Sequence, residues 1–155
     1  MPANHDRARR TPARVDDRPT WLLSRVFSRS SGLLFRTFDE RGEGLRGYHY
    51  RLLAALEQWG PASQADLGRD TGIDRSDVTA VLGELEERGL VDRQIDPDHK
   101  RRKIVTITAA GLKELTRLDR IVDDVQQAVL APLTDAQQRQ FLSLLRKLLE
   151  APPGE

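Results

Sequence analysis

The sequence lacks cysteine entirely, contains only three histidines and has no long apolar run. Without cysteine there can be no disulfide bond, thiolate metal ligand, cysteine nucleophile or thiol redox sensor. The histidines, at positions 5, 49 and 99, do not have the spacing of metal ligands, so we expect neither a metal nor another cofactor. No segment approaches the ~18 consecutive apolar residues of a membrane-spanning helix, and we expect no membrane contact.

Motifs of catalysis are also missing. The chain has no G-x-S-x-G, no S-x-x-K and no phosphate-binding Walker loop. One literal G-x-G-x-x-G occurs at residues 42–47, but a helical pattern precedes it and no βαβ unit surrounds it. We interpret this segment as a flexible connection between helices. Asp96 and Asp98 resemble the start of a calcium loop without its Gly and closing Glu. We therefore predict no catalytic residue and no enzymatic activity.

The composition predicts one compact unit. A chain of 155 residues fits a single domain, and 38 % hydrophobic residues can build a core. The net charge of +1 indicates neither a nucleic acid nor a membrane as partner. The first 18 residues carry five Arg and little to bury, which predicts a disordered basic tail over 1–18. This tail has no apolar segment after Met1, so we expect no secretory signal and a cytoplasmic protein.

Apolar residues at spacings of three and four predict long helices on both sides of a central region. The N-terminal pair covers residues 21–38 and 48–59. Thr108 caps a third helix that ends at Pro132, and a capping box at residues 134–137 opens a fourth. Such helices exceed what a domain of ~45 residues can cover. We therefore predict association of two copies of the chain, with a monomeric helical bundle as the alternative.

The central region predicts a helix-turn-helix followed by a β-hairpin. Ser63 is the expected N-cap of a short helix, and Asp74 that of a second one over residues 75–88. Gly72 lets the chain reverse between them. Alternating residues at 90–95 and 103–107 predict two strands joined by a long loop. This order of elements is that of a winged helix-turn-helix.

In such a unit the first turns of the second helix face the major groove of DNA. Arg75 can form two hydrogen bonds to guanine, Thr79 can bond to a base or a phosphate, and Asp77 can accept a hydrogen bond from cytosine. Ser63 and its neighbour lie at a helix N-terminus, where a phosphate can bind. The DNA contacts expected from the two helices are Ser63, Gln64, Arg75, Ser76, Asp77 and Thr79.

The hairpin loop carries most of the positive charge. The segment HKRRK at 99–103 holds four full positive charges, and an Arg at a hairpin tip fits a narrow A·T minor groove. Residues 63–107 contain eight Lys and Arg but ten Asp and Glu, so the basic surface is local, as in a sequence-specific binder. A winged-helix module that binds protein or RNA is the alternative. The expected wing contacts are Lys100, Arg101, Arg102 and Lys103.

The central region resembles the MarR family of bacterial transcriptional regulators. The resemblance is carried by IDRSDVT at 73–79, LEERGLVDR at 85–93, DP-x5-KIVTIT at 96–108 and T-x-x-G at 108–111. It implies a mainly α fold with a small β-hairpin wing, in a homodimer whose terminal helices interlock. It further implies that two recognition helices enter successive major grooves of a pseudo-palindromic operator in double-stranded DNA.

The resemblance also implies roles for single residues. Arg101 stands where family members place the wing-tip arginine in the minor groove. His99 stands where the family usually has the aspartate that holds this arginine, and Asp98 lies next to it. Ala80 stands where many members have a basic residue after the recognition-helix Thr.

Finally, the resemblance implies a small aromatic or anionic effector, bound between the dimerisation helices and the DNA-binding lobe. Aromatic and charged groups at the expected place belong to Trp21, Arg46, His49 and Tyr50. The alternative is that Trp21 and Tyr50 are ordinary core or dimer contacts. We thus predict a dimeric, ligand-responsive repressor. Its parts are a tail (1–18), N-terminal dimerisation helices (19–58), a DNA-binding lobe (59–107) and C-terminal dimerisation helices (108–150).

Overall fold

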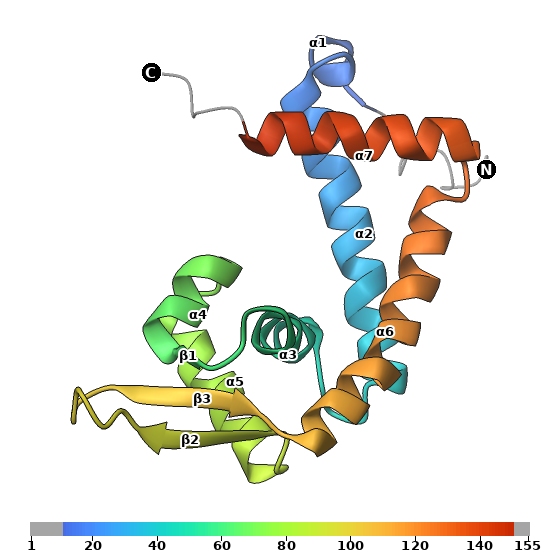
Figure 1. Ribbon diagram of the computed structural model, residues 1–155. Coiled ribbons are helices and arrows are strands. Elements are labelled where there is room, and N and C mark those ends of the chain that lie inside the picture. The colour runs from blue at the N-terminus through green and yellow to red at the C-terminus, as the bar shows by residue number, and fades with distance from the viewer. Residues whose placement is uncertain (1–10, 151–155) are drawn as a thin grey trace, which may run out of the picture.

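The computed structural model describes residues 11–150 and confirms a mainly helical fold with a small β-sheet (Figure 1). One lobe contains the helix-turn-helix and the hairpin. The helices over residues 19–41 and 109–130 extend away from it, and the helix over residues 135–150 lies at their far end. The elements in chain order are α1 (Ala13–Asp16), α2 (Pro19–Arg41), α3 (Gly47–Trp59), β1 (Ala62–Ser63), α4 (Gln64–Thr71), α5 (Arg75–Glu87), β2 (Val91–Ile95), β3 (Lys103–Ile107), α6 (Ala109–Leu130) and α7 (Asp135–Glu150).

The core of the lobe lies between α3, α4, α5 and the sheet. The predicted inward residues of α5, Val78, Leu82 and Leu85, are fully buried. Gly72 (φ +66°) ends α4 and Gly89 (φ +69°) follows α5. Both adopt the left-handed conformation that glycine tolerates best, so each helix can stop and the chain can turn sharply.

The sheet has the order β1-β3-β2, with all neighbours antiparallel. The predicted hairpin is present, and its register runs from Val91 opposite Ile107 to Ile95 opposite Lys103. Strand β1 was not predicted. It has two residues, and Ser63 lies opposite Ile104. This short pairing attaches the start of α4 to β3 near the end of the strand that faces the wing loop.

Thr108 joins the hairpin to α6, as its sequence position predicts. Its hydroxyl accepts a hydrogen bond from Gly111 N–H (3.0 Å) and donates to Gly89 O (2.7 Å). Its own N–H donates to Leu90 O (3.1 Å). A Cβ on Gly111 would stand 2.1 Å from Leu90 O. The start of α6 is therefore packed tightly against the base of the hairpin.

The glycine-rich connection at residues 42–47, interpreted above as flexible, is instead a packed turn. Leu45 is 1 % exposed. Arginines from two other helices bind carbonyl groups of this segment and of its neighbour: Arg88 donates to Glu43 O and Arg117 donates to Arg41 O, both at 2.9 Å. Glycine allows the backbone to pack closely at position 42, because a Cβ there would stand 2.3 Å from a backbone oxygen.

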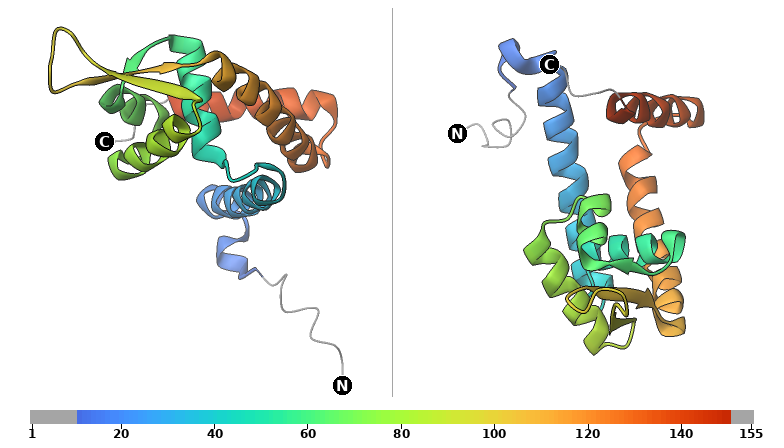
Figure 2. Two further views of the ribbon diagram at one scale, coloured as in Figure 1. Left: turned by 90° about the horizontal axis from the view of Figure 1, so that it is seen from below. Right: turned by 60° about the vertical axis from the view of Figure 1, so that its left-hand side comes forward.

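The outer helices leave large apolar surfaces uncovered. α7 has no buried residue, although the predicted capping box, Thr134 with Gln137, opens it. α7 crosses α2 in the view of Figure 1, but Figure 2 separates the two helices and shows α7 extending from the end of α6. Within residues 11–150 no helix is both long enough and apolar enough to cross a membrane. The exposed apolar residues on α2 and α7 include Leu22, Leu23, Val26, Phe27, Leu142, Leu144, Leu148 and Leu149.

The end of the predicted basic tail differs from the expectation. Residues 1–10 lie outside the described part, but Ala13–Asp16 form the helical turn α1, where we expected no regular structure. Pro12 occupies its N-cap with φ −62°. Val15 N–H donates to Pro12 O, and Arg18 N–H donates to Val15 O, both at 3.0 Å. A proline that already has a suitable φ favours such a turn.

Candidate nucleic-acid interface

The first turns of α5 present the predicted recognition residues to solvent. Arg75, Ser76, Asp77 and Thr79 are exposed, while Val78 between them is buried in the core. The burial of one residue per turn thus fixes which face of α5 points outward. Asp74 occupies the predicted N-cap position, but its side chain makes no capping hydrogen bond.

A side-chain contact fixes α4 against α5 at this face. The Gln64 amide donates a hydrogen bond to the Thr79 hydroxyl, which donates in turn to Arg75 O (2.9 Å). Thr79 therefore has no hydroxyl proton left for DNA in this arrangement, although its oxygen can still accept. The contact holds the two helices of the helix-turn-helix together next to Arg75.

Ser63 is not available as the predicted phosphate contact. It is 3 % exposed, and its hydroxyl donates to Asp66 Oδ2 (2.6 Å) and accepts from Asp66 N–H (3.1 Å). The hydrogen bond from Ser63, followed by that from Arg69, holds the pKa of Asp66 below its ordinary value. Ser63 is thus the N-cap of α4, as expected, and this role occupies its hydroxyl.

The wing loop is closed by its own backbone. Asp96 N–H donates to Arg102 O (2.8 Å), and Arg102 N–H donates to His99 O (2.7 Å). The Asp98 N–H donates to Asp96 Oδ1 (2.9 Å). Figure 2 shows the hairpin projecting from the lobe. These bonds shape the loop that carries the positive charges.

The four predicted wing contacts divide into two groups. Lys100, Arg101 and Lys103 are exposed, and within residues 11–150 their side chains form no hydrogen bond or ion pair with another group. In particular, no carboxylate in that range pairs with Arg101, so Asp98 does not replace the missing aspartate. Arg102 differs from these three, because its guanidinium binds Asp66 Oδ2 at 2.6 Å.

The acidic side chains of α5 are neutralised away from its first turns. Glu86 pairs with Arg93 of β2, and this arginine lowers the pKa of the glutamate. Glu84 binds Arg46 at 3.2 Å. The negative charge counted in the sequence is thus partly paired at the C-terminal half of α5, and the wing tip keeps its positive charge.

Of the predicted effector residues, Arg46 and His49 lie together, whereas Trp21 is far from them. Trp21 lies near the start of α2, about 30 Å of helix before Arg41, where Arg25 stacks over its ring. His49 is fully buried: its Nδ1 accepts from Arg46 N–H (2.9 Å), and its Nε2 lies 2.7 Å from Glu84 Oε2. Arg46 and His49 therefore bind each other and α5.

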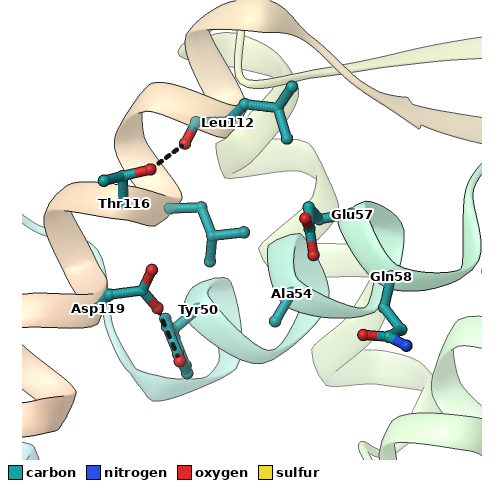
Figure 3. Close-up of a pocket in the computed structure, with 8 residues that line it drawn as sticks. Tyr50, Ala54, Glu57, Gln58, Leu112, Thr116 and Asp119 are labelled. Atoms are coloured by element: carbon teal, nitrogen blue, oxygen red, sulfur yellow. Dashed lines mark hydrogen bonds between the residues drawn. The ribbon is translucent and has the colours of Figure 1, made fainter.

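Tyr50, also a predicted effector residue, lines a cavity. This cavity, of about 320 Å³, lies between α3 and α6 (Figure 3). Tyr50 OH donates to Asp119 Oδ1 (3.0 Å), and burial, together with this aspartate, raises the pKa of Tyr50 to about 12. The lining residues from α6 were not predicted, because the sequence pattern of that helix indicated only an apolar dimerisation surface. The full lining is Tyr50, Ala54, Glu57, Gln58, Leu112, Leu115, Thr116 and Asp119.

Comparison with known proteins adds an independent result. Residues 43–102 match the model of the MarR family. The transcriptional repressor Mb2911 of Mycobacterium bovis is 33 % identical over 68 % of this chain and 76 % of its own length. A putative transcriptional regulatory protein for the hcr operon of Thauera aromatica is 31 % identical over 68 % of this chain, and the match spans only 64 % of that protein. The structure of BpsR from Bordetella bronchiseptica, whose DNA binding is regulated by 6-hydroxynicotinic acid, is similar with a TM-score of 0.79. The two share 25 % identity over 92 % of this chain and all of that one.

Proposed function

Because this chain belongs to the MarR family of transcriptional regulators, we propose that it represses transcription as a homodimer on a pseudo-palindromic operator. As a member of that family it is a DNA-binding regulator and not an enzyme. The observation that carries the proposal is the lobe itself. It combines an exposed face on the first turns of α5 with a wing on which Lys100, Arg101 and Lys103 form no ion pair within residues 11–150. A protein with this role acts where the DNA is, so we assign it to the cytoplasm.

The exposed faces of α2 and α7 support the homodimer. Phe27 is 71 % exposed and Leu149 84 % exposed, and each stands among further exposed leucines of its helix. Contiguous apolar surfaces of this kind mark interaction sites in soluble proteins. A second copy with the same surfaces can cover both, which gives a two-fold assembly. Two recognition helices would then lie about one DNA turn apart, on half-sites centred ~10 bp from each other.

The proposed DNA contacts follow from which groups are available. Arg75, Ser76 and Asp77 face base edges, while Lys100, Arg101 and Lys103 reach the backbone and the flanking minor groove. Gln64 and Thr79 contribute through the contact that holds α4 to α5. Ser63 and Arg102 leave the set of direct contacts, since Asp66 already binds both.

The test starts from a random-sequence duplex library, from which the protein enriches its own target. Fluorescence anisotropy at fixed salt with non-specific competitor then measures affinity, because phosphate contacts alone give strongly salt-dependent binding. We expect binding that survives competitor, at two chains per two-fold site, and sedimentation at about twice the chain mass of 17.5 kDa. A monomer that enriches no duplex would refute the proposal in favour of a winged-helix module that binds protein or RNA.

We further propose the cavity between α3 and α6 as the effector site. It is large enough for a small aromatic molecule. Its lining contains two carboxylates, Glu57 and Asp119, and no basic residue. Of the aromatic and anionic effectors that the family resemblance implies, this lining favours an aromatic that donates hydrogen bonds, because a bound anion would face unpaired like charge.

Three molecules of matched shape test this preference: para-hydroxybenzyl alcohol, para-hydroxybenzylamine and para-hydroxybenzoate. We expect the alcohol and the amine to raise the thermal unfolding temperature more than the carboxylate does. Asp119→Asn should reduce the advantage of the amine. Asp92→Asn, at an exposed position of β2 that does not line the cavity, should leave it unchanged. Preferential stabilisation by the benzoate would contradict the assignment.

A further inference from the structure

Arg102 and Asp66 join the wing to α4 through a contact between elements far apart in the sequence. Arg102 is the last residue before β3 and closes the wing loop with its backbone. Its Nη2 donates to Asp66 Oδ2 at 2.6 Å, across 36 positions of sequence. Asp66 lies in the first turn of α4 and also binds Ser63 and Arg69. The Asp66 carboxylate thus binds Ser63 at the N-cap of α4, Arg69 within α4 and Arg102 of the wing.

The contact lies where backbone pairing to the rest of the lobe has ended. β1 pairs with β3 only as far as Ser63 opposite Ile104. Beyond that pair, toward the tip, β3 has only its partner strand β2, which ends with it at the pair Ile95–Lys103. An isolated two-stranded hairpin is marginally stable in water. Within residues 11–150, the Arg102–Asp66 ion pair is the one side-chain hydrogen bond or ion pair of 4 Å or less that joins this outer part of the hairpin to the helix-turn-helix.

We propose that Arg102 is a positioning residue that sets the wing tip against the helix-turn-helix through Asp66, and that it does not contact DNA. The inference rests on the proposed DNA-binding function, whose minor-groove contact it places at Arg101. The pair fixes the direction in which Lys100 and Arg101 leave the lobe. Its carboxylate also offsets the charge of Arg102, so the free positive charge is concentrated at the tip.

Substitution of Asp66 gives opposite results for a positioning role and for a direct contact. If Arg102 bound a phosphate, Asp66→Asn would remove a negative charge near DNA and would tighten binding or leave it unchanged. If Arg102 positions the wing, Asp66→Asn frees the tip and weakens binding despite that favourable change in charge. Both side chains are partly exposed, at 45 % and 32 %. Exposed ion pairs contribute little to folding, so the variants keep a folded lobe.

The experiment measures affinity for the duplex that the wild type enriches from a random library, as a function of salt. Hydroxyl-radical footprinting reports wing contact in the flanking minor groove. We expect Asp66→Asn and Arg102→Gln each to weaken binding about two- to fivefold, as for loss of an exposed ion pair, and to reduce protection of the flanks. The double variant should be no weaker than either single one, because they act through the same contact.

Arg69→Gln is the matched control. Arg69 binds the same carboxylate at 2.8 Å, but it belongs to α4 and cannot position the wing. It should leave the flanking footprint intact. Arg101→Gln, a variant of the proposed direct contact, should lower the slope of log affinity against log salt by about 0.9. Arg102→Gln should lower that slope no more than Asp66→Asn does, because both variants act only through the position of the wing tip. An unchanged footprint in Asp66→Asn, with a reduced salt slope in Arg102→Gln, would overturn the proposal and make Arg102 a phosphate contact.

A measurement without DNA separates this inference from the proposed function. Backbone amides of the loop at residues 96–102 should exchange hydrogen faster in Asp66→Asn and Arg102→Gln than in the wild type and in Arg69→Gln. Equal exchange in all four proteins refutes the positioning role even if the protein binds no duplex. Faster exchange with no duplex enriched would refute only the DNA-binding proposal.

Discussion

The buried histidine of α3 makes the stability of this protein depend on pH in a defined direction. His49 is fully buried, and its Nδ1 accepts a hydrogen bond from Arg46 N–H (2.9 Å). The proton of the neutral ring therefore lies on Nε2, which donates to Glu84 Oε2 (2.7 Å). A second proton would have to sit on Nδ1, opposite an N–H donor. Burial lowers the pKa of His49 below the ordinary 6.5, and the charges of Arg46 and Arg88 lower it further, against the opposing effect of Glu84.

The direction of this pH dependence follows from which state, folded or unfolded, binds a proton at His49 first as the pH falls. In the unfolded chain His49 titrates near its ordinary pKa of 6.5. As the pH falls below that value, the unfolded chain takes up the proton before the folded one does, so the free energy of unfolding decreases. The decrease ends once the pH has passed the lower pKa of the folded state. One group can contribute at most about 1.4 kcal/mol per pH unit in this window. Well above pH 6.5 it contributes no pH dependence.

The substitution His49→Ala should cost about 2–4 kcal/mol at pH 7.5. Two hydrogen bonds are lost at about 1 kcal/mol each, and a cavity and an unpaired Arg46 N–H remain in the core. Urea unfolding at pH 7.5, 6.5 and 5.5, at equal protein concentration, measures both effects. The stability difference between the wild type and His49→Ala should shrink as the pH falls. His99→Ala, which removes an exposed side chain of the wing and leaves no cavity, should cost far less at pH 7.5 than His49→Ala. A difference that stays constant across the three pH values would refute the reasoning.

Further predictions concern DNA contacts, packing and assembly. Arg75→Ala should cost about 1–3 kcal/mol of binding free energy and relax specificity at one base pair. Arg101→Ala should weaken binding and reduce the preference for A·T pairs at the flanks of the site. Competition with duplexes that differ at single base pairs distinguishes the two effects. Gly111→Ala should strongly lower the unfolding temperature, because its Cβ would stand 2.1 Å from a backbone oxygen. At Gly83 a Cβ meets nothing within 4 Å, so Gly83→Ala should stabilise α5 by about 0.5–1 kcal/mol. Leu148→Asp, at an exposed apolar site of α7, should shift sedimentation from dimer to monomer without disturbing the lobe; an unchanged dimer would place the interface elsewhere.

Local signals predicted the elements of the fold well. The caps at Ser63, Thr108 and Thr134 each depend on residues within three positions, and the structure contains all three. The left-handed glycines at 72 and 89 also follow from local backbone geometry. Strand β1 was missed because two residues carry no period, and its partner strand lies some forty positions further along.

The candidate site was predicted less completely, because the sequence does not say which polar groups are already paired. Arg102 and Arg101 are adjacent and chemically identical, yet only Arg102 reaches Asp66. His49 was expected to be available for an effector, whereas its two ring nitrogens already bind Arg46 and Glu84. Such distinctions depend on contacts between distant segments. Asp119 became a candidate only when the fold placed it against Tyr50.

The attachment of α6 to the hairpin has a mechanical consequence. α6 has 22 residues and is therefore about 33 Å long, and the Thr108 bonds make the hairpin move with its first turn. In the proposed homodimer, α6 would act as a lever held among the outer helices, and the cavity lies beside the end of α6 that carries the hairpin. A tilt of about 5° displaces the far end by about 3 Å. Two such levers sharing a pivot would change the distance between the wings by about 6 Å, against the ~34 Å that separates successive major grooves. In the proposed homodimer, a molecule a few ångströms thick bound between α3 and α6 would therefore be large enough to shift both wings relative to the DNA grooves.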